Sequence, residues 1–429
     1  MSTNFDRFNP HWIGVNLENY LKHRDIFKSL SSKIDRKLMT FLIGPRRVGK
    51  SVLLKQLLSH LITEKNVKPS QILYWEFSPR DPKEVLQEVL DDYIYKIADV
   101  KSTFYLFLDE IQYVKAWESM IKIIYDQYPN VRIIITGSLS LSYKRRMEES
   151  LAGRFLPVYI FPLNFKEYLN FKGKSELFHD LNQINTWEIS AKAKNLNADF
   201  VDFLQLGRYP DTLNLSPIEA NDYIKTIQYQ TLGQDSVDYF QIEKVNILQG
   251  IFEYFRINSG GEVSYAKLAQ VLNGVRPETI SKYVDILELL RLIYIVPNTS
   301  NPLKATISNR KIYVNSAFSL NNLNSSFVDN LGLAAESYVL EQLLQKGDKI
   351  SYFRHRSEEV DFIQWKKFEE IGKFFAGNAF EVKYQHKIDP KDSKNLKKIS
   401  QKLNLKPNLL SLDESLTEED LTISPICLF

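Results

Sequence analysis

The chain has 429 residues, which at roughly 100 to 200 residues per domain implies two to four folded units. Hydrophobic residues make up 44% and charged residues 25%, with 16 Gly and 16 Pro, so a disordered, collagen-like or low-complexity chain is excluded. The 55 Lys and Arg residues against 52 Asp and Glu leave a net charge of +3. This balance argues against a uniformly basic nucleic-acid or membrane-surface binder, although local patches remain open.

Cysteine content and hydropathy bear on the compartment. The one cysteine, Cys427, can form no intramolecular disulfide and no Cys-based zinc site. The most apolar stretches, Arg132–Leu141 and Leu287–Val296, are shorter than the roughly 20 residues that span a bilayer. The N-terminus shows no secretory signal. We therefore expect a cytoplasmic protein with no membrane span.

From residue 37 to residue 163, short β-branched or aromatic runs alternate with helical patterns. The runs are KLMTFLIG, QILYWEF, TFYLFLDE, VRIIITGS and LPVYIFPL. Such alternation predicts a parallel sheet wrapped by helices, and the near-continuous apolar runs suit a sheet that is buried on both faces. The fold class is therefore α/β, and we assign this first domain to residues 1–165.

The remaining sequence divides into three predicted segments. Residues 166–245 read as a helical lid or connector. Residues 246–300 have helix-turn-helix spacing, with Gly274 and Pro277 between two helices and the run LIYIV after them, which predicts a winged-helix-like module. Residues 301–429 alternate strands and helices, from KIYVN to a final TISPICLF strand, and predict an α+β domain.

A phosphate-binding motif lies between the first apolar run and the helix that follows it. The sequence GPRRVGKS fits GxxxxGK[ST] and has the required strand before it and helix after it. Lys50 is expected to reach the β and γ phosphates, and the Ser51 hydroxyl to ligate Mg²⁺. The predicted nucleotide-binding residues are Gly44, Pro45, Arg46, Arg47, Val48, Gly49, Lys50, Ser51 and Val52.

Two carboxylates end the run FYLFLDE, at the edge where such a sheet presents its ligands. Asp109 is expected to hold the magnesium shell, and Glu110 to orient and polarise the attacking water. QILYWEF comes between the phosphate loop and this strand, so we expect the Asp109 strand to lie away from the loop's own strand. The alternative for Glu110 is a solvated carboxylate or an ion-pair partner.

Further catalytic candidates follow in the chain. Ser138 or Thr136, at the end of VRIIITGS, could contact the γ-phosphate or the water, and either could instead cap a helix or turn. Transition-state charge could be stabilised by Arg145, Arg146 or Arg154, of which Arg154 in LAGRF is the preferred candidate. Its alternative is a surface ion pair.

These motifs together resemble a large prokaryotic family of AAA-type ATPases with an uncharacterised C-terminal region. The resemblance rests on GPRRVGKS, LFLDEIQ, IIITGS, LAGRF, PLNFKEYL and GRYPD, and covers nearly the whole chain. It implies that the chain binds ATP and Mg²⁺ and hydrolyses ATP. It also implies a winged-helix-like segment at TISKYVDILELLRLIYIVP and a final domain similar to PD-(D/E)xK (restriction-endonuclease-like) nucleases. The residues on the family's pattern are Gly44, Gly49, Lys50, Ser51, Asp109, Glu110 and Arg154.

Four residues near the C-terminus have the order of a nuclease-like core. Glu381 and Lys383 are two apart on an expected strand and so share one of its faces. Asp361 and Glu381 could hold Mg²⁺, Lys383 could activate water, and Glu336 could add a ligand. The alternative is an ordinary ion pair in an inert fold. The nearby Lys391, Lys394, Lys398 and Lys402 recur at helical spacing and form either a phosphate-binding stripe or a solvated face.

The sequence thus predicts a Mg²⁺-dependent ATPase whose nucleotide state repositions its winged-helix and nuclease-like domains on a nucleic-acid (DNA or RNA) or protein partner. Two alternatives are an ATP-gated endonuclease and a nucleotide-operated binding switch with an inert nuclease fold. If Arg154 acts on a neighbouring copy, the chain assembles as a homo-oligomer.

Overall fold

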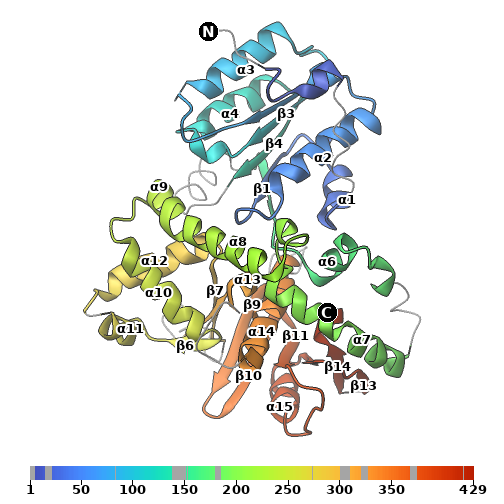
Figure 1. Cartoon of the computed structure of the whole chain (residues 1–429), viewed down its shortest axis with the longest axis vertical. Helices are drawn as coiled ribbons and strands as arrows, with labels where there is room; N and C mark the ends of the chain where they lie inside the picture. Colours follow the sequence, from blue (N-terminus) through green and yellow to red (C-terminus); the bar gives the residue numbers. More distant parts are fainter. Residues whose placement is uncertain are drawn as a thin grey trace. The chain divides into compact units, whose positions relative to one another are not determined.

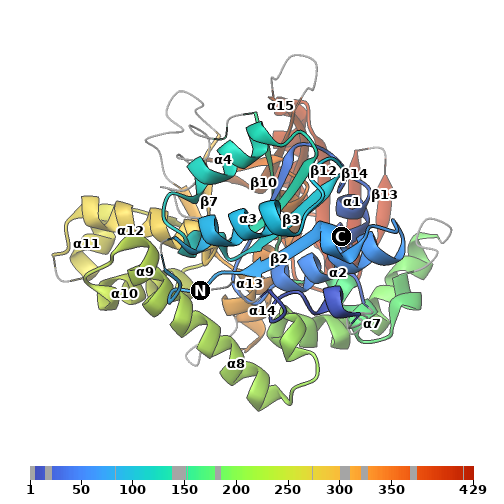
Figure 2. The ribbon, with the colours of Figure 1, turned by 90° about the horizontal axis from the view of Figure 1, so that it is seen from above.

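The computed structural model divides into two compact units, Met1–Ile160 (unit 1) and Phe161–Phe429 (unit 2), which are considered separately (Figures 1 and 2). It describes residues 5–14, 22–82, 84–137, 151, 153–178, 185–272, 274–299, 310–319, 327–367, 374–418 and 420–429. Within these ranges, no helix is both long enough and apolar enough to cross a membrane.

The described part of unit 1 is a parallel sheet with helices on both faces. Its strands are β1 (Met39–Ile43), β2 (Ile72–Glu76), β3 (Phe104–Asp109), β4 (Val131–Gly137) and β5 (Phe155–Tyr159), in the order β2-β3-β4-β1-β5. Its helices are α1 (Ile26–Ser31), α2 (Lys50–Thr63), α3 (Val85–Lys96) and α4 (Trp117–Gln127). Alternate residues of the strands pack on α3 and α4, and α1 and α2 lie on the other side (Figure 1).

The sheet order confirms the predicted parallel α/β fold and refines one detail. The Asp109 strand does lie away from the phosphate-loop strand, as expected. The strand that separates them is β4, however, and β2 lies at the edge of the sheet. Parallel neighbours need crossover connections, so order along the chain does not by itself give order in the sheet.

Side chains near the N-terminus cover the free edge of β2. The Asn9 carboxamide oxygen accepts the Tyr74 N–H at 2.8 Å. The Ile72 carbonyl oxygen lies 2.9 Å from Trp12 Nε1 and 3.1 Å from His11 Nε2. These groups satisfy backbone atoms that an edge strand would otherwise expose to a second chain.

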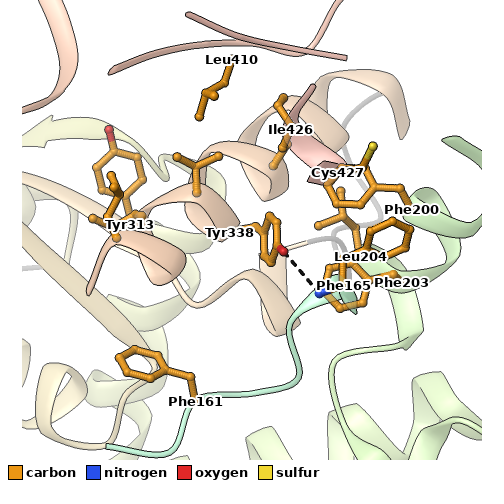
Figure 3. Packing of buried hydrophobic residues seen from close by; sticks show 14 of the residues in the cluster. Phe161, Phe165, Phe200, Phe203, Leu204, Tyr313, Tyr338, Leu410, Ile426 and Cys427 are labelled. Atoms are coloured by element: carbon orange, nitrogen blue, oxygen red, sulfur yellow. Dashed lines mark hydrogen bonds between the residues drawn. The ribbon is translucent and has the colours of Figure 1, made fainter. Parts of the chain in front are cut away.

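Unit 2 begins with the helices that the sequence assigned to a connector. These are α6 (Phe165–Phe171), α7 (Thr186–Leu206), α8 (Pro217–Gln230) and α9 (Ser236–Phe240), with a π-helical turn at Thr231–Asp235 between α8 and α9. Capping boxes begin α6, α7 and α8. The aromatic rings of α6 and α7 share a core with α14 (Phe327–Gln345), which comes much later in the chain (Figure 3). These helices therefore pack as part of unit 2.

The next segment combines three helices with a small antiparallel sheet. In chain order its elements are α10 (Val245–Ile257), β6 (Gly261–Val263), α11 (Tyr265–Val271), α12 (Pro277–Leu289), β7 (Ile293–Pro297) and β8 (Arg310–Val314). The sheet order is β6-β8-β7. The sequence assigned KIYVN to the last domain, but this run forms β8 and pairs with β7, with Tyr294 opposite Tyr313. The boundary at residue 300 therefore cuts through this sheet.

A mixed sheet forms the C-terminal part of unit 2. Its elements are α13 (Ser316–Ser319), α14 (Phe327–Gln345), β9 (Lys349–His355), β10 (Glu358–Lys367), β11 (Phe374–Lys383), α15 (Lys394–Leu403), β12 (Lys406–Ser411), β13 (Leu416–Glu418) and β14 (Leu421–Pro425). The order is β13-β14-β12-β11-β10-β9. Strands β9, β10 and β11 are antiparallel neighbours, and β11, β12 and β14 run parallel.

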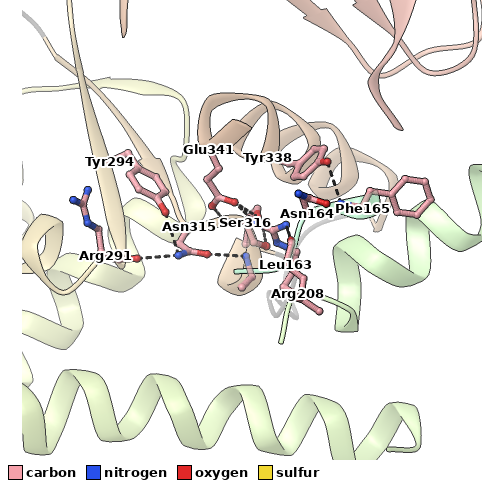
Figure 4. Close-up of polar contacts among 12 residues, drawn as sticks. Leu163, Asn164, Phe165, Arg208, Arg291, Tyr294, Asn315, Ser316, Tyr338 and Glu341 are labelled. Carbon is pink, nitrogen blue, oxygen red and sulfur yellow. Dashed lines mark hydrogen bonds and ion pairs between the residues drawn. The ribbon is translucent and has the colours of Figure 1, made fainter. Parts of the chain in front are cut away.

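A buried ion pair joins the GRYPD segment to α14 (Figure 4). The Arg208 guanidinium pairs with the Glu341 carboxylate, and neither side chain is exposed to solvent. The same carboxylate accepts the backbone N–H of Ser316 at 2.8 Å. The guanidinium also lies 5.0 Å from the Phe203 ring centre and 5.2 Å from that of Tyr338. The arginine thus ties three segments of unit 2 together.

Candidate functional site

The phosphate loop of unit 1 connects β1 to α2, and two of its glycines are required by geometry. Gly49 has φ 92°, in the left-handed region that favours glycine. A Cβ at position 44 would collide with the Ile160 carbonyl oxygen. The loop therefore keeps its backbone close to β5 and directs the N-terminus of α2 toward the place where phosphates bind in such loops.

The Lys50 side chain is buried and folds back over the phosphate loop. Its ammonium donates to the carbonyl oxygens of Gly44 and Pro45 at 3.0 and 2.9 Å. Ser51 follows it in the first turn of α2 and is partly buried. If a nucleotide bound in this loop, the ammonium could exchange its two carbonyl partners for phosphate oxygens, and Ser51 could contribute a hydroxyl ligand to Mg²⁺.

An arginine that the sequence did not single out braces the loop. Arg24, before α1, donates from Nη1 to the Val48 carbonyl oxygen at 2.9 Å and is buried. Arg46 donates to the Tyr113 hydroxyl at 3.1 Å, which links the loop to the segment after Glu110. Arg24 could not be recognised from the sequence because it lies 24 residues before its partner and outside any motif.

At the carboxyl ends of β2, β3 and β4, hydroxyl groups hold Asp109 in a buried position. Tyr74 donates to Asp109 Oδ2 at 2.8 Å, and the Thr136 hydroxyl donates to the other carboxylate oxygen. The Thr136 oxygen in turn accepts the Glu110 N–H at 3.0 Å. Of the two hydroxyl candidates on this strand, Thr136 therefore contacts the predicted acids, while Ser138 lies outside the described residues.

Glu110 adopts an unusual backbone conformation immediately after β3. Its φ is 55°, which costs an L-residue on the order of 1 kcal/mol and is typical of functional sites. Its carboxylate accepts a hydrogen bond from the Gln112 carboxamide. Gly137 makes room for that side chain, since a Cβ there would lie 2.6 Å from Gln112 Oε1. Gln112 thus contacts the Glu110 side chain, and Thr136 contacts the Glu110 backbone N–H.

A third carboxylate, Glu76, ends β2 opposite Asp109 in the register. Burial, together with the charges of Asp109 and Glu110, raises the pKa of Glu76 above its usual range. This edge of the sheet is therefore rich in negative charge and suits a cation. Lys50 and Ser51 lie at the start of α2, next to the phosphate loop. A P-loop site takes few protein ligands to Mg²⁺ because phosphate oxygens and water supply the others. The donor set present fits Mg²⁺ bound together with ATP.

Arg154 lies at the other end of the strands. It forms a two-pronged ion pair with Asp126, at 2.9 and 3.1 Å, and its backbone oxygen accepts the N–H of Met39, the first residue of β1. The phosphate loop follows Ile43 at the opposite end of β1, about 16 Å away at ~3.3 Å per residue. The structure does not bring Arg154 to its own domain's phosphate loop. Arg145 and Arg146 lie outside the described residues.

In unit 2, the four predicted nuclease-like residues lie near one another on α14, β10 and β11. Lys383 pairs with Glu381 at 2.8 Å, and the Asp361 carboxylate accepts the Val382 N–H at 3.0 Å. Burial and the charge of Asp361 raise the pKa of Glu336 to about 7 and that of Glu381 to about 8.

The sequence did not identify the second lysine of this cluster. Lys311, on β8, lies 2.7 Å from the Glu359 carboxylate and 3.6 Å from that of Asp361. The nearby carboxylates of Asp361, Glu336 and Glu359 outweigh burial and raise the pKa of Lys311, which stays charged. In the part of the chain that the structure describes, no three His, Cys, Asp or Glu side chains form a group that could hold a metal ion. This arrangement does not support the predicted metal site.

The lysine-rich helix α15 is also partly neutralised. Lys398 pairs with Glu358 of β10, and Lys397 pairs with Asp420 at 3.0 Å. The Lys402 ammonium lies 5.8 Å from the Phe353 ring centre. Of these contacts, the Lys398 ion pair reduces the positive charge of the predicted stripe, and a phosphate-binding role for the stripe stays a prediction.

Comparison with known proteins finds a similarity to a described family in the first part of the chain. Residues 36–169 match a family described as an AAA domain, while residues 197–329 and 331–424 match families described as domains of unknown function (DUF8612 and DUF4143). The chain is 28% identical over 369 residues to an uncharacterised protein of Methanocaldococcus jannaschii, covering 83% of this chain and 78% of that protein.

Solved structures align more distantly. PCH-2 of C. elegans aligns over 50% of this chain at 16% identity with a TM-score of 0.32, and the match spans only 65% of PCH-2, less than two thirds of its length. The Aeropyrum pernix ORC1 protein, solved in complex with DNA, aligns over 79% of this chain and 98% of its own at 10% identity with a TM-score of 0.33. The AAA-domain match, together with the geometry of the phosphate loop and the Asp109 edge, supports a P-loop AAA-type ATPase domain with a nucleotide-dependent activity in unit 1.

Proposed function

We propose that unit 1 binds ATP with Mg²⁺ and hydrolyses it. The observation that carries this proposal is the network at the carboxyl edge of the sheet, in which the Thr136 hydroxyl bridges Asp109 and the Glu110 backbone. Thr136 lies on β4, beside the phosphate-loop strand β1, and Asp109 lies on β3, one strand further, at the same end of the sheet. A sheet edge of this kind is where nucleotides bind in doubly wound folds.

Each residue then has a defined task. Lys50 moves from its loop carbonyls to the β and γ phosphates, and the glycine-containing loop offers backbone N–H groups to phosphate oxygens. Ser51 and Asp109 hold Mg²⁺, which neutralises phosphate charge when bound. Glu110 accepts a proton from the attacking water, and Gln112 and Thr136 keep Glu110 in position.

Equilibrium titration with a fluorescent ATP analogue tests the binding step. Lys50→Ala should weaken binding by tenfold or more, while Lys65→Ala, which changes an exposed lysine at the far end of α2, should bind like the wild type. Equal affinities for the Lys50→Ala and wild-type proteins would reject the assignment of this loop.

We further propose that residues 245–314 form a winged helix. The support is the order α10, β6, α11, α12, β7, β8 with β8 between the other two strands. We propose a nuclease-like fold for the C-terminal sheet, because a helix, three antiparallel strands, a second helix and a parallel strand follow one another there. Asp361 lies on β10, Glu381 and Lys383 lie on β11, and Glu336 lies on the helix before these strands.

For the whole chain, we propose a nucleotide-operated switch that repositions unit 2 on a nucleic-acid or protein partner. The lysine pairing of the C-terminal carboxylates favours an inert binding fold over an ATP-gated endonuclease. Incubation with plasmid, single-stranded DNA and RNA in Mg²⁺ or Mn²⁺, with and without ATP, tests this choice. We expect no cleavage. Cleavage that disappears in Glu381→Ala protein would establish the endonuclease instead.

A further inference from the structure

Strand β8 carries two side chains that donate to a group of carboxylates in unit 2. This carboxylate cluster consists of Glu336, Glu359, Asp361 and Glu381. Lys311 and Tyr313 are two residues apart and so lie on one face of the strand. The Lys311 ammonium contacts Glu359 at 2.7 Å and Asp361 at 3.6 Å. The Tyr313 hydroxyl donates to Glu336 Oε1 at 2.7 Å. A strand of the small sheet thus supplies partners to acids on both β10 and α14.

Protein donors contact three of the four carboxylate oxygens of Asp361 and Glu381. One oxygen of Asp361 faces Lys311 and the other accepts the Val382 N–H. Glu381 Oε1 pairs with Lys383, and its Oε2 is buried with no hydrogen-bond partner among the described residues. A divalent ion requires several oxygens at about 2.0 to 2.6 Å from a common point. Of these four oxygens only Glu381 Oε2 lacks a partner, and the described residues contain no group of three acidic, His or Cys side chains that could surround a metal ion.

Lys311 is held in this position from several sides. Its side chain is 5% exposed, and its ammonium lies 5.4 Å from the Tyr352 ring centre. Strand β8 pairs with β6 on one side and β7 on the other, so the lysine cannot withdraw while the sheet stays intact. A buried ammonium is stable only with carboxylate partners, and the carboxylates equally need a cation.

We propose that the Lys311 ammonium is a tethered cation that takes the place of a divalent metal ion in this cluster, so that unit 2 excludes metal while β8 remains in its sheet. The lysine and a metal ion then compete for the same carboxylates. Replacing the ammonium by a neutral side chain of similar length converts a closed, charge-balanced cluster into a vacancy for a cation.

Titration of nucleotide-free, full-length protein with Mn²⁺, followed by isothermal calorimetry and by the electron paramagnetic resonance signal of free Mn²⁺, tests this proposal. The wild type and Lys311→Arg should show no binding at this cluster at millimolar Mn²⁺. Lys311→Met should bind at least tenfold more tightly than the wild type, and Asp361→Asn added to Lys311→Met should abolish that gain. Lys406→Met, an exposed lysine on β12 of the same mixed sheet, is the matched control and should behave as the wild type.

Thermal unfolding gives a second readout that does not depend on any enzymatic activity. Lys311→Met should unfold at a lower temperature than the wild type without metal, and Mn²⁺ should raise its Tm while leaving the wild-type Tm unchanged. Mn²⁺ binding by the wild type that is lost in Asp361→Asn would overturn the proposal, even if Lys311→Met failed to fold. A folded Lys311→Met protein that binds no Mn²⁺ would overturn it equally.

Discussion

The Thr136 hydroxyl, at the end of β4, accepts the Glu110 backbone N–H at 3.0 Å. It also donates to Asp109, so one side chain contacts both of the acids that we propose for ATP hydrolysis. Thr136→Val removes both contacts with little change in shape. We expect kcat for ATP hydrolysis to fall on the order of tenfold to hundredfold, with nucleotide affinity nearly unchanged. Thr136→Ser keeps the hydroxyl and should retain most activity, so equal rates for the Val and Ser proteins would refute the role.

Arg154 pairs with Asp126 at the edge of the sheet away from the phosphate loop. Both side chains are partly exposed, so water screens this ion pair. We therefore expect Arg154→Ala protein to hydrolyse ATP within about twofold of the wild-type rate. A large loss of turnover that is restored by mixing with Lys50→Ala protein would show instead that Arg154 acts on a neighbouring copy.

The Arg208–Glu341 pair should dominate the stability of unit 2. Arg208→Met leaves a buried carboxylate without its cation and should lower the free energy of unfolding by about 3 to 5 kcal/mol. Arg208→Met combined with Glu341→Leu leaves no unpaired charge and should be more stable than Arg208→Met alone. Urea unfolding measures both values, and a single variant as stable as the wild type would contradict this account.

The raised pKa values of Glu336 and Glu381, to about 7 and about 8, predict a pH dependence of stability. Both lie above the ordinary carboxyl value, so the folded state binds more protons than the unfolded state in this range. The resulting stabilisation is full below about pH 4.5 and is lost as the pH rises through 7 and 8.

We therefore expect the free energy of unfolding of unit 2 to fall between pH 5 and pH 8. Glu381→Gln removes one titrating group and should flatten this dependence. Glu418→Gln, on an exposed strand, should leave it unchanged. Urea unfolding at the two pH values measures the effect. An equal change in the free energy of unfolding between pH 5 and pH 8 for the wild type and Glu381→Gln would contradict the assignment.

Local patterns in the sequence predicted much of unit 1. The runs ending at Ile43, Asp109 and Gly137 form β1, β3 and β4, because continuous apolar residues suit a strand covered on both faces. The phosphate-loop residues lie where their motif places them, because the motif is contiguous. The functions of the catalytic residues remain proposals.

Contacts between distant segments could not be predicted in this way. Arg24 donates to the Val48 carbonyl oxygen, and Lys311 contacts Asp361, which lies 50 positions later in the sequence. Neither Arg24 nor Lys311 belongs to a sequence motif. The assignment of β8 to the last domain was wrong for the same reason, since strand pairing depends on the tertiary fold. The sequence singled out Glu336, Asp361 and Glu381, which lie near one another in the structure, but it did not single out Lys311, which contacts Asp361.

Steady-state hydrolysis of Mg²⁺-ATP by the wild-type and Glu110→Gln proteins tests the central claim most directly. Glutamine preserves the size of the side chain and its contact with Gln112 but cannot accept the proton from water. We predict that Glu110→Gln binds the ATP analogue like the wild type and loses about a hundredfold or more in kcat, with Glu64→Gln as a control at wild-type activity. Turnover by Glu110→Gln at the wild-type rate would contradict the account.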